Sequence, residues 1–289
     1  MESFAPFILL MKPGIVAAVL LAGFTGMVLA ERGWPDPTTA LICLASLSLA
    51  AAGSAMLNCL IEAPLDIRMA RLQTRVAALE KAGRGRVLAI ALIGICASAA
   101  LAIRYLNPLA LLLILTAVLS YTLLYTVGCK RRSPWGTVIG GIPGALPVLI
   151  GNAASGHSLG LDGIILFTII FLWQPPHFWA LALEYRHDYR AAGIPVLPVT
   201  HGESYTKKLI VIHATALLPA SLSLWLFGFC SAWYAAFALI SGLAFPAALY
   251  YLIVRRGRFV MAFSASILYL TLLLLAIVAD ICLVQGAIQ

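Results

Sequence analysis

Charged residues are scarce in this sequence, and no polar stretch is long enough to form an aqueous domain. Only 10% of the 289 residues are Asp, Glu, Lys or Arg, whereas 62% are hydrophobic. Soluble globular proteins contain roughly 25% charged residues. The composition therefore excludes a soluble globular protein and predicts a chain that folds in lipid.

Cysteine gives no sign of a metal or redox site. The 6 cysteines are scattered, mostly within apolar segments, and no two have the Cys-x-x-Cys spacing of zinc or thiol–disulfide sites. We interpret them as small hydrophobic residues of the protein interior.

Apolar segments long enough to cross a bilayer follow one another along the chain. A spanning helix needs about 20 apolar residues. We therefore predict a single all-α domain over residues 1–289, a polytopic membrane protein whose nine transmembrane helices surround a central cavity open to the cytoplasmic side. The nine segments lie near 14–31, 38–60, 87–105, 108–127, 136–154, 162–182, 209–229, 231–254 and 260–284.

The fifth of these segments is interrupted by glycine and proline. Gly140, Gly141, Pro143, Gly144 and Pro147 all lie within it. A helix of this composition frees backbone groups that neighbouring helices or a cavity must satisfy. We expect this span to be broken or closely packed.

The basic residues predict the orientation of the helices. The net charge is +8, and all but Arg32 and Arg104 of the 19 Lys and Arg residues fall on one side if the N-terminus is inside. Cytoplasmic loops carry such an excess. We predict a bacterial inner-membrane protein with the N-terminus inside and the C-terminus outside, whose basic loops meet anionic lipid or substrate and not nucleic acid.

Acidic residues at the inner end of the second predicted helix point to function, because such residues are costly near a bilayer. Asn58, Glu62 and Asp66 are spaced by four, so a helix would carry all three on one face. Two carboxylates and an amide suit Mg²⁺, which prefers oxygen ligands and often bridges to a substrate phosphate. Pro64 lies between the two acids and predicts a kink or an end of the helix.

A second acidic pair follows the sixth predicted helix. Glu184 and Asp188 are again four apart, and arginines follow both acidic groups. Two such groups across a cavity would bind a diphosphate through Mg²⁺, while arginines held its oxygens. The hypothesis is a membrane enzyme that acts on a diphosphate. The alternative is a pair of solvated helix ends whose charges meet lipid headgroups.

Two further groups fit a diphosphate substrate with an allylic chain. Lys130 and Arg131 lie at a membrane edge, either as orientation signals or as part of a diphosphate pocket. Tyr121 and Tyr125, one helical turn apart, either anchor the helix at the interface or shield an allylic cation with their rings.

The sixth predicted helix contains an unusual histidine. Pro175 and Pro176 are expected to break the helix, and His177 follows them directly. This histidine is a candidate metal ligand or proton carrier, or one partner of an interhelical hydrogen bond.

These stretches resemble a known family. NCLIEAPLDIRMARLQTR is similar to the N-x-x-x-[DE]-x-x-x-D signature of the intramembrane aromatic prenyltransferases related to 4-hydroxybenzoate polyprenyltransferase. Three other stretches resemble the heme O synthases (protoheme IX farnesyltransferases) of this superfamily: LLMKPGI, KRRSPWGTVIGGIPGALPVLIG and FLWQPPHFWALALEYRHDYRAAGIPVLPV. The resemblance covers nearly the whole chain up to about residue 208.

The resemblance implies Mg²⁺-dependent transfer of farnesyl from farnesyl diphosphate to a vinyl group of heme b, which gives heme o. It implies that Asn58, Glu62 and Asp66 hold metal and diphosphate, and that Asp188 belongs to the second acidic loop, where Glu184 fits the wider superfamily. Membrane lipid, heme a synthase and terminal oxidase assembly are the other implied partners. The remaining implied substrate contacts are Arg71, Thr74, Arg75, Lys130, Arg131 and His177.

Two alternatives stay open. Ala63, Pro64 and Val76 depart from the family pattern in the first loop, which leaves room for another aromatic acceptor, such as a benzoate or a quinone precursor. Broken helices with polar groups also occur in transporters, and a non-catalytic oxidase assembly factor is the other non-enzyme reading. The acids lie at helix ends and not at mid-membrane, which favours an enzyme.

Overall fold

The computed structural model describes residues 4–155 and 158–285, and every regular element in these two ranges is a helix. Nine helices within these ranges are long and apolar enough to cross a membrane, which confirms the predicted spans. The helices are α1 Ala5–Met11, α2 Pro13–Glu31, α3 Pro37–Asp66, α4 Gln73–Ala82, α5 Arg84–Tyr105, α6 Pro108–Leu119, α7 Gly136–Ile139, α8 Gly141–Ala154, α9 Leu161–Glu184, α10 Arg186–Ala191, α11 Leu197–Thr200, α12 Glu203–Leu226, α13 Ala232–Leu249 and α14 Phe259–Ala279. A 3₁₀ turn, η1 Ala70–Leu72, precedes α4, and three helices continue as π-helical segments: η2 Ser120–Cys129, η3 Tyr250–Arg255 and η4 Asp280–Gln285.

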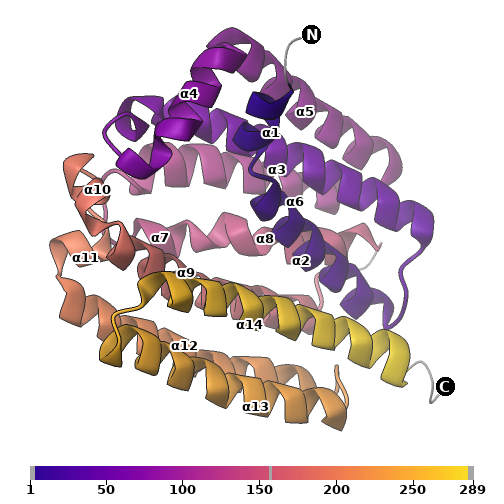
Figure 1. The fold of residues 1–289 in the computed structure, drawn as a ribbon. Helices are drawn as coiled ribbons and strands as arrows, with labels where there is room; N and C mark the ends of the chain where they lie inside the picture. Colours follow the sequence, from indigo (N-terminus) through magenta and orange to yellow (C-terminus); the bar gives the residue numbers. More distant parts are fainter. Residues whose placement is uncertain (1–3, 156–157, 286–289) are drawn as a thin grey trace.

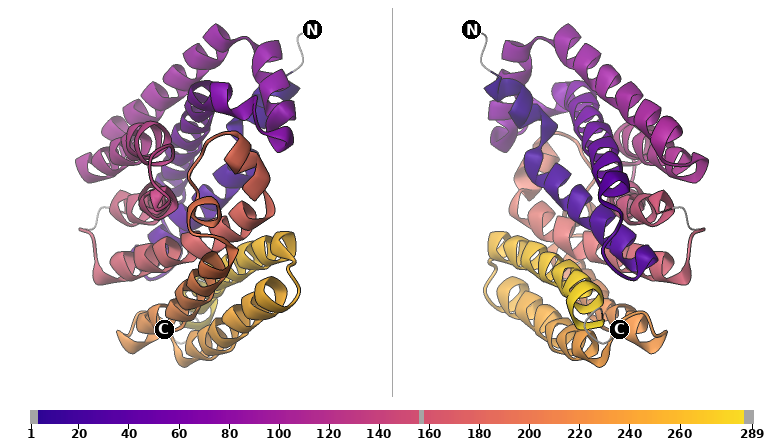
Figure 2. Two further views of the ribbon diagram at one scale, coloured as in Figure 1. Left: turned by 90° about the vertical axis from the view of Figure 1, so that its left-hand side faces the viewer. Right: turned by 90° about the vertical axis from the view of Figure 1, so that its right-hand side faces the viewer.

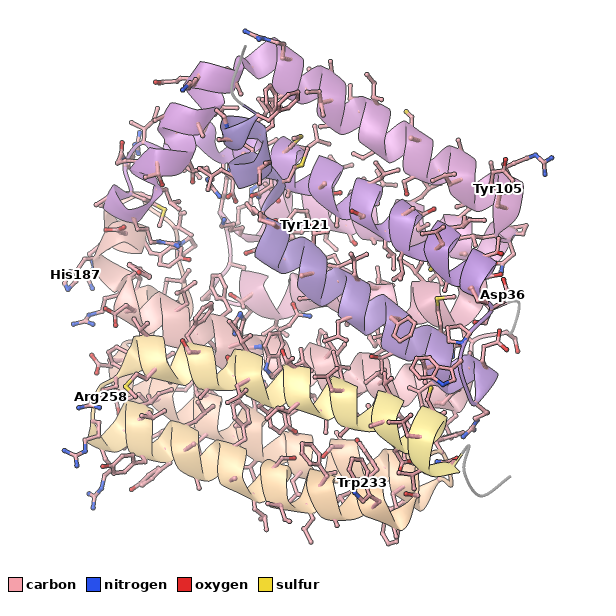
Figure 3. The ribbon with its side chains drawn as sticks, turned by 45° about the vertical axis from the view of Figure 1, so that its right-hand side comes forward. Asp36, Tyr105, Tyr121, His187, Trp233 and Arg258 are labelled. Carbon is pink, nitrogen blue, oxygen red and sulfur yellow. The ribbon has the colours of Figure 1, made fainter. Side chains whose placement is uncertain are left out.

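The long helices run side by side, with the first half of the chain on one side of the bundle and α12–α14 on the other (Figure 1). The short helices α4, α10 and α11 gather at one end, together with segments 130–135 and 256–258. We call this the basic end. Viewed from it, α10 and α11 lie between the first-half helices and α12–α14 (Figure 2, left). His187 and Arg258 lie at the basic end, whereas Asp36, Tyr105 and Trp233 lie at the other (Figure 3).

Apolar side chains cover the outside of the bundle as well as its inside. Trp179 and Tyr234 are fully buried in a core built mainly from α9, α12, α13 and α14. Ile93 and Ile240, by contrast, are 68% and 69% exposed. Exposed apolar surface on this scale marks contact with a membrane or a partner, and it agrees with helices that face lipid.

The interrupted fifth span is both broken and closely packed, as expected. Gly140 separates α7 from α8, and α8 packs against α2. A Cβ atom on Gly151 would lie 1.9 Å from the carbonyl oxygen of Gly23, and one on Gly26 would lie 2.2 Å from that of Val148. The two helix backbones therefore touch at positions that only glycine permits.

The predicted break of the sixth span is wrong, because Pro175 and Pro176 lie inside α9, which runs without interruption to Glu184. Pro64 lies in the last turn of α3, which ends at Asp66, close to the kink or end predicted there. Each proline removes one backbone donor, but packing against neighbouring helices tolerates this loss within a membrane bundle. Both Pro175 and Pro176 are buried in such contacts.

Candidate active site

The last two turns of α3 carry a buried polar face. Asn58, Glu62 and Asp66 are only 2%, 2% and 3% exposed. The four-residue spacing places them on one side because α3 is helical up to Asp66. Buried charges of this kind need partners.

The partners of the two carboxylates come from other elements. Arg75 of α4 forms ion pairs with Asp66 and with Glu62, the latter at 3.4 Å between Nη2 and Oε2. Lys130, directly after η2, forms an ion pair with the other oxygen of Glu62. Burial acts to lower the pKa of Arg75 and of Lys130, but the neighbouring carboxylates raise both pKa values above the usual range. Both side chains are therefore held as cations.

Lys12 completes this face and is a residue that sequence reasoning did not single out. It joins α1 to α2 in a left-handed conformation (φ +54°), and its Nζ donates to Oδ1 of Asn58 at 2.7 Å. Nδ2 of Asn58 in turn donates to Oγ1 of Thr126 at 3.1 Å. Burial, together with the nearby charges of Arg75 and Lys130, lowers the pKa of Lys12 to about 8. Two signals in the sequence could have found it: its position directly before Pro13, and its place in LLMKPGI, one of the stretches that carry the family resemblance.

The second loop reaches the first one through Asp188. Its Oδ2 accepts a hydrogen bond from the backbone N–H of Arg71 at 3.2 Å. The guanidinium of Arg71 donates to the hydroxyl of Tyr189 at 2.8 Å and lies 4.8 Å from the ring centre of Tyr185. The structure thus brings Asp188 to the arginine-rich loop. Glu184 is exposed at the end of α9 and makes no hydrogen bond or ion pair with the described residues.

Aromatic side chains line the η2 side of the cluster. Tyr121 and Tyr125 stack with their ring centres 5.9 Å apart. Nζ of Lys130 lies 5.8 Å from the Tyr125 ring. Arg131 is exposed and donates to the carbonyl oxygen of Ile61 at 2.8 Å. The predicted basic pair is therefore divided: Lys130 points to the acids, and Arg131 fixes the end of α3.

Two predicted substrate contacts lie apart from this cluster. Thr74 is exposed and lines a small hollow between α1 and α4. His177 lies between α9 and α14, stacked between Trp173 and Phe263 with ring centres 4.3 Å away on each side. Its Nδ1 is 2.7 Å from Oγ of Ser266, so it makes the interhelical hydrogen bond that was one reading of the sequence.

The donor set suits a hard cation shared with a phosphate. Within residues 4–155 and 158–285, no three His, Cys, Asp or Glu side chains gather into a metal site. Buried oxygens of Asn58, Glu62 and Asp66 nevertheless lie beside the cationic groups of Lys12, Arg75 and Lys130. Nε of Arg71 and of Arg75 is buried without a partner among the described residues. Mg²⁺ usually takes one or two carboxylates plus substrate phosphates, so the residues fit a metal–diphosphate pair better than a metal alone.

The chain resembles known proteins over most of its length. Residues 19–259 match the UbiA prenyltransferase family. A protoheme IX farnesyltransferase of Geotalea uraniireducens is 52% identical over 256 residues, which are 89% of this chain and 99% of that protein.

Solved structures share the fold. A digeranylgeranylglyceryl phosphate synthase structure has a TM-score of 0.78 at 18% identity and covers 97% of this chain and 99% of its own. A UbiA homolog from Archaeoglobus fulgidus, bound to DMAPP and Mg²⁺, has a TM-score of 0.68 at 13% identity, covering 94% of this chain and 99% of its own. At these identities, the likeness is one of architecture.

Proposed function

The chain belongs to the UbiA prenyltransferase family, among relatives that are protoheme IX farnesyltransferases, and from this premise we propose that it transfers a farnesyl group from farnesyl diphosphate to a vinyl group of heme b, giving heme o. The observation that carries the proposal is the buried cluster in which Glu62 and Asp66 form ion pairs with Arg75 and Lys130, while Lys12 donates to Asn58 on the same helix face. Such a cluster has both carboxylates that can bind a metal ion and cationic side chains that can bind a diphosphate.

The basic side chains would bind the diphosphate by exchanging partners. Arg75 and Lys130 hold the carboxylates of α3 through ion pairs. Phosphate oxygens offer the same guanidinium and ammonium groups charge-assisted hydrogen bonds of the same kind. Nε of Arg71 and of Arg75, both buried and without a described partner, would gain an acceptor in the same step.

The carboxylates released by this exchange would then serve the metal. Asn58, Glu62, Asp66 and Asp188 would hold Mg²⁺, with Glu184 as a further candidate ligand. Bound there, Mg²⁺ would neutralise the leaving diphosphate and favour ionisation of the allylic C–O bond. This bond breaks with both electrons going to the diphosphate oxygen.

The rest of the site would protect the farnesyl cation until it reacts. The ring faces of Tyr121 and Tyr125 stabilise a nearby cation through their π-electrons, and the apolar helices behind them exclude water. A heme vinyl carbon then forms the new C–C bond. Water adds to the carbon left cationic, and loss of one proton yields the hydroxyl group of the product.

The proposal also covers location and partners. We place the protein in a bacterial inner membrane with the basic end in the cytoplasm, as the distribution of Lys and Arg indicates. Heme b and farnesyl diphosphate would be its substrates, and heme a synthase or a terminal oxidase would receive the product. A central cavity open to the cytoplasmic side belongs to the same proposal.

One assay tests the function. Purified protein is incubated in lipid or detergent with heme b, farnesyl diphosphate and Mg²⁺, and the products are identified by mass. We expect a farnesylated, hydrated heme. A parallel reaction contains 4-hydroxybenzoate in place of heme. Product in the phenol reaction and none in the heme reaction would contradict the proposed acceptor while keeping prenyl transfer.

A further inference from the structure

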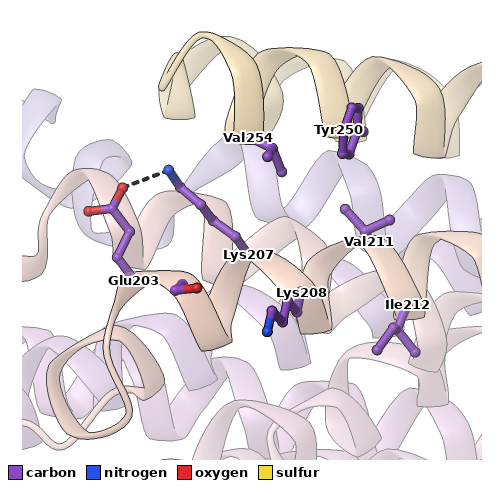
Figure 4. Close-up of a pocket in the computed structure, with 8 residues that line it drawn as sticks. Glu203, Lys207, Lys208, Val211, Ile212, Tyr250 and Val254 are labelled. Atoms are coloured by element: carbon purple, nitrogen blue, oxygen red, sulfur yellow. Dashed lines mark ion pairs between the residues drawn. The ribbon is translucent and has the colours of Figure 1, made fainter.

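A groove on the α12 side of the bundle lies away from the acidic cluster. It has a volume of about 660 Å³ and runs between α12 and the end of α13 with η3 (Figure 4). Ligand sites in proteins usually occupy about 300–1,000 Å³. The acidic cluster, in contrast, is built from α3, α4 and the residue after η2, on the opposite side of the bundle (Figure 1).

The walls of this groove are apolar and continuous with the outer surface of the bundle. Val211 and Ile212 come from α12, and Tyr250 and Val254 come from η3. Ile212 is 60% exposed and Tyr250 is 48% exposed. Because these positions lie on membrane-spanning helices, the groove opens sideways towards the hydrocarbon chains of lipids and not only towards water.

The charges lie at one end of the groove. Lys207 and Lys208 line it at the basic end, where Lys207 forms an ion pair with Glu203 at 2.7 Å. Figure 4 shows Lys207 and Glu203 at one end of the drawn residues, with Tyr250 and Ile212 further along. Nζ of Lys207 also lies 5.5 Å from the ring of Phe259. The groove is therefore cationic at one end and apolar along its length.

The segment next to this end adds more positive charge. Arg255, Arg256 and Arg258 lie between Val254, which lines the groove, and Phe259, which contacts Lys207. All three arginines are exposed, and Arg256 donates to the hydroxyl of Tyr251 at 2.9 Å. Glu203 is the only acidic side chain among the described residues that line the groove. The charge around this end is strongly positive.

We propose that this groove is a binding site for one anionic phospholipid. An acyl chain lies along Val211, Ile212, Tyr250 and Val254, and the phosphate lies at Lys207 and Lys208. A soluble anion would leave the apolar walls unused, and a lipid without net charge would leave the positive charge that exceeds Glu203 at this end uncompensated. The Lys207–Glu203 pair is partly exposed, so it is weak enough to exchange for a phosphate.

Native mass spectrometry tests this site. Detergent-purified protein is titrated with phosphatidylglycerol or with phosphatidylcholine of the same chain composition. We expect one phosphatidylglycerol molecule to be retained in preference to phosphatidylcholine. Each basic side chain near an anionic lipid surface contributes about fivefold in affinity, so Lys207→Gln/Lys208→Gln should weaken retention by roughly 25-fold.

Two further variants separate a built groove from general surface attraction. Val254→Trp fills the groove and keeps every charge. We expect this variant to lose the preference for phosphatidylglycerol over phosphatidylcholine. Lys81→Gln/Arg84→Gln removes the same charge from exposed positions at the basic end outside the groove, and we expect retention as in the wild type.

Three results would overturn the proposal. The first is equal retention of the two lipids by the wild type. The second is unchanged retention in Val254→Trp, which would mean attraction to a charged surface without a groove. The third is displacement of the lipid by inorganic phosphate at concentrations that leave the protein folded, which would identify a site for small anions.

Discussion

Buried carboxylates occur at both ends of this bundle, and their partners differ in kind. Asp280 is fully buried at the end opposite the basic end, where it accepts hydrogen bonds from the backbone N–H and the hydroxyl of Ser231 and from the side chain of Gln285. Glu62 and Asp66 are paired instead with Arg75 and Lys130, long cationic side chains that lie outside α3.

This difference in donors is the basis on which we propose a structural role for one carboxylate and a functional role for the others. The donors to Asp280 are neutral, and they include Ser231, the N-cap of α13, so this carboxylate links the start of α13 to η4. The donors to Glu62 and Asp66 are flexible cations that a diphosphate also attracts. Burial alone does not distinguish these two regions, but the chemistry of the donors does.

The largest expected effect comes from the acids of the basic end. Asp66→Asn should lower farnesyl transfer by roughly 100- to 1,000-fold, because a neutral amide removes charge from the proposed metal site. Asp188→Asn should act in the same way. Turnover is measured at saturating Mg²⁺, with thermal unfolding in detergent as the control for folding. Near-normal turnover in either variant would remove that acid from the metal site.

A smaller loss is expected from the basic partner of these acids. Arg75→Gln should lower transfer roughly 10- to 100-fold, since it removes a cation that contacts both carboxylates and, in our proposal, the diphosphate. The matched control is Lys81→Gln, an exposed position on the same helix. We measure kcat and KM for farnesyl diphosphate; equal kinetics in the two variants would contradict the role of Arg75.

Lys12 should make the reaction sensitive to alkaline pH. Because its pKa is about 8, kcat/KM should fall as the pH rises above 8, by up to about tenfold per pH unit. In the unfolded chain the pKa of Lys12 keeps its ordinary value of 10.5. Between pH 8 and 10.5 the unfolded chain therefore binds this proton and the folded protein does not, so folding stability should rise with pH in this range. In Lys12→Arg the alkaline fall should disappear; a fall identical to that of the wild type would assign it to another group.

The smallest effect on catalysis is expected at Asp280. Asp280→Asn weakens the hydrogen bonds to Ser231 and Gln285 and should cost about 1–3 kcal/mol of stability. Farnesyl transfer per folded molecule should stay at the wild-type level. Thermal unfolding and turnover are measured on the same preparation. A loss of turnover comparable to that of Asp66→Asn would remove the distinction between the two ends.

Much of the fold was predictable because hydropathy and helical spacing are local properties. The nine spans follow from apolar segments of sufficient length, and the shared face of Asn58, Glu62 and Asp66 follows from their spacing on a helix. The continuity of α9 at Pro175 and Pro176 was not predictable, because it depends on neighbours that satisfy the interrupted backbone. Residue type alone predicted a break there.

The site was only partly predictable, because its contacts join distant parts of the chain. Lys12 and Thr126 contact Asn58 across 46 and 68 residues, and no local pattern relates them. The metal and substrate roles given to Thr74, Glu184 and His177 remain predictions, since Thr74 and Glu184 are exposed and His177 hydrogen-bonds to Ser266. For Thr74 and Glu184, position in the sequence did not reveal which way the side chain faces.

The proposed metal–diphosphate site can be probed without turnover, by calorimetry of inorganic pyrophosphate binding with and without Mg²⁺. We expect wild-type protein and Asp280→Asn to bind pyrophosphate tightly only when Mg²⁺ is present, and Asp66→Asn to lose this dependence together with most of the affinity. Equal binding by the wild type in Mg²⁺ and in a chelator, or wild-type behaviour in Asp66→Asn, would contradict the proposed site.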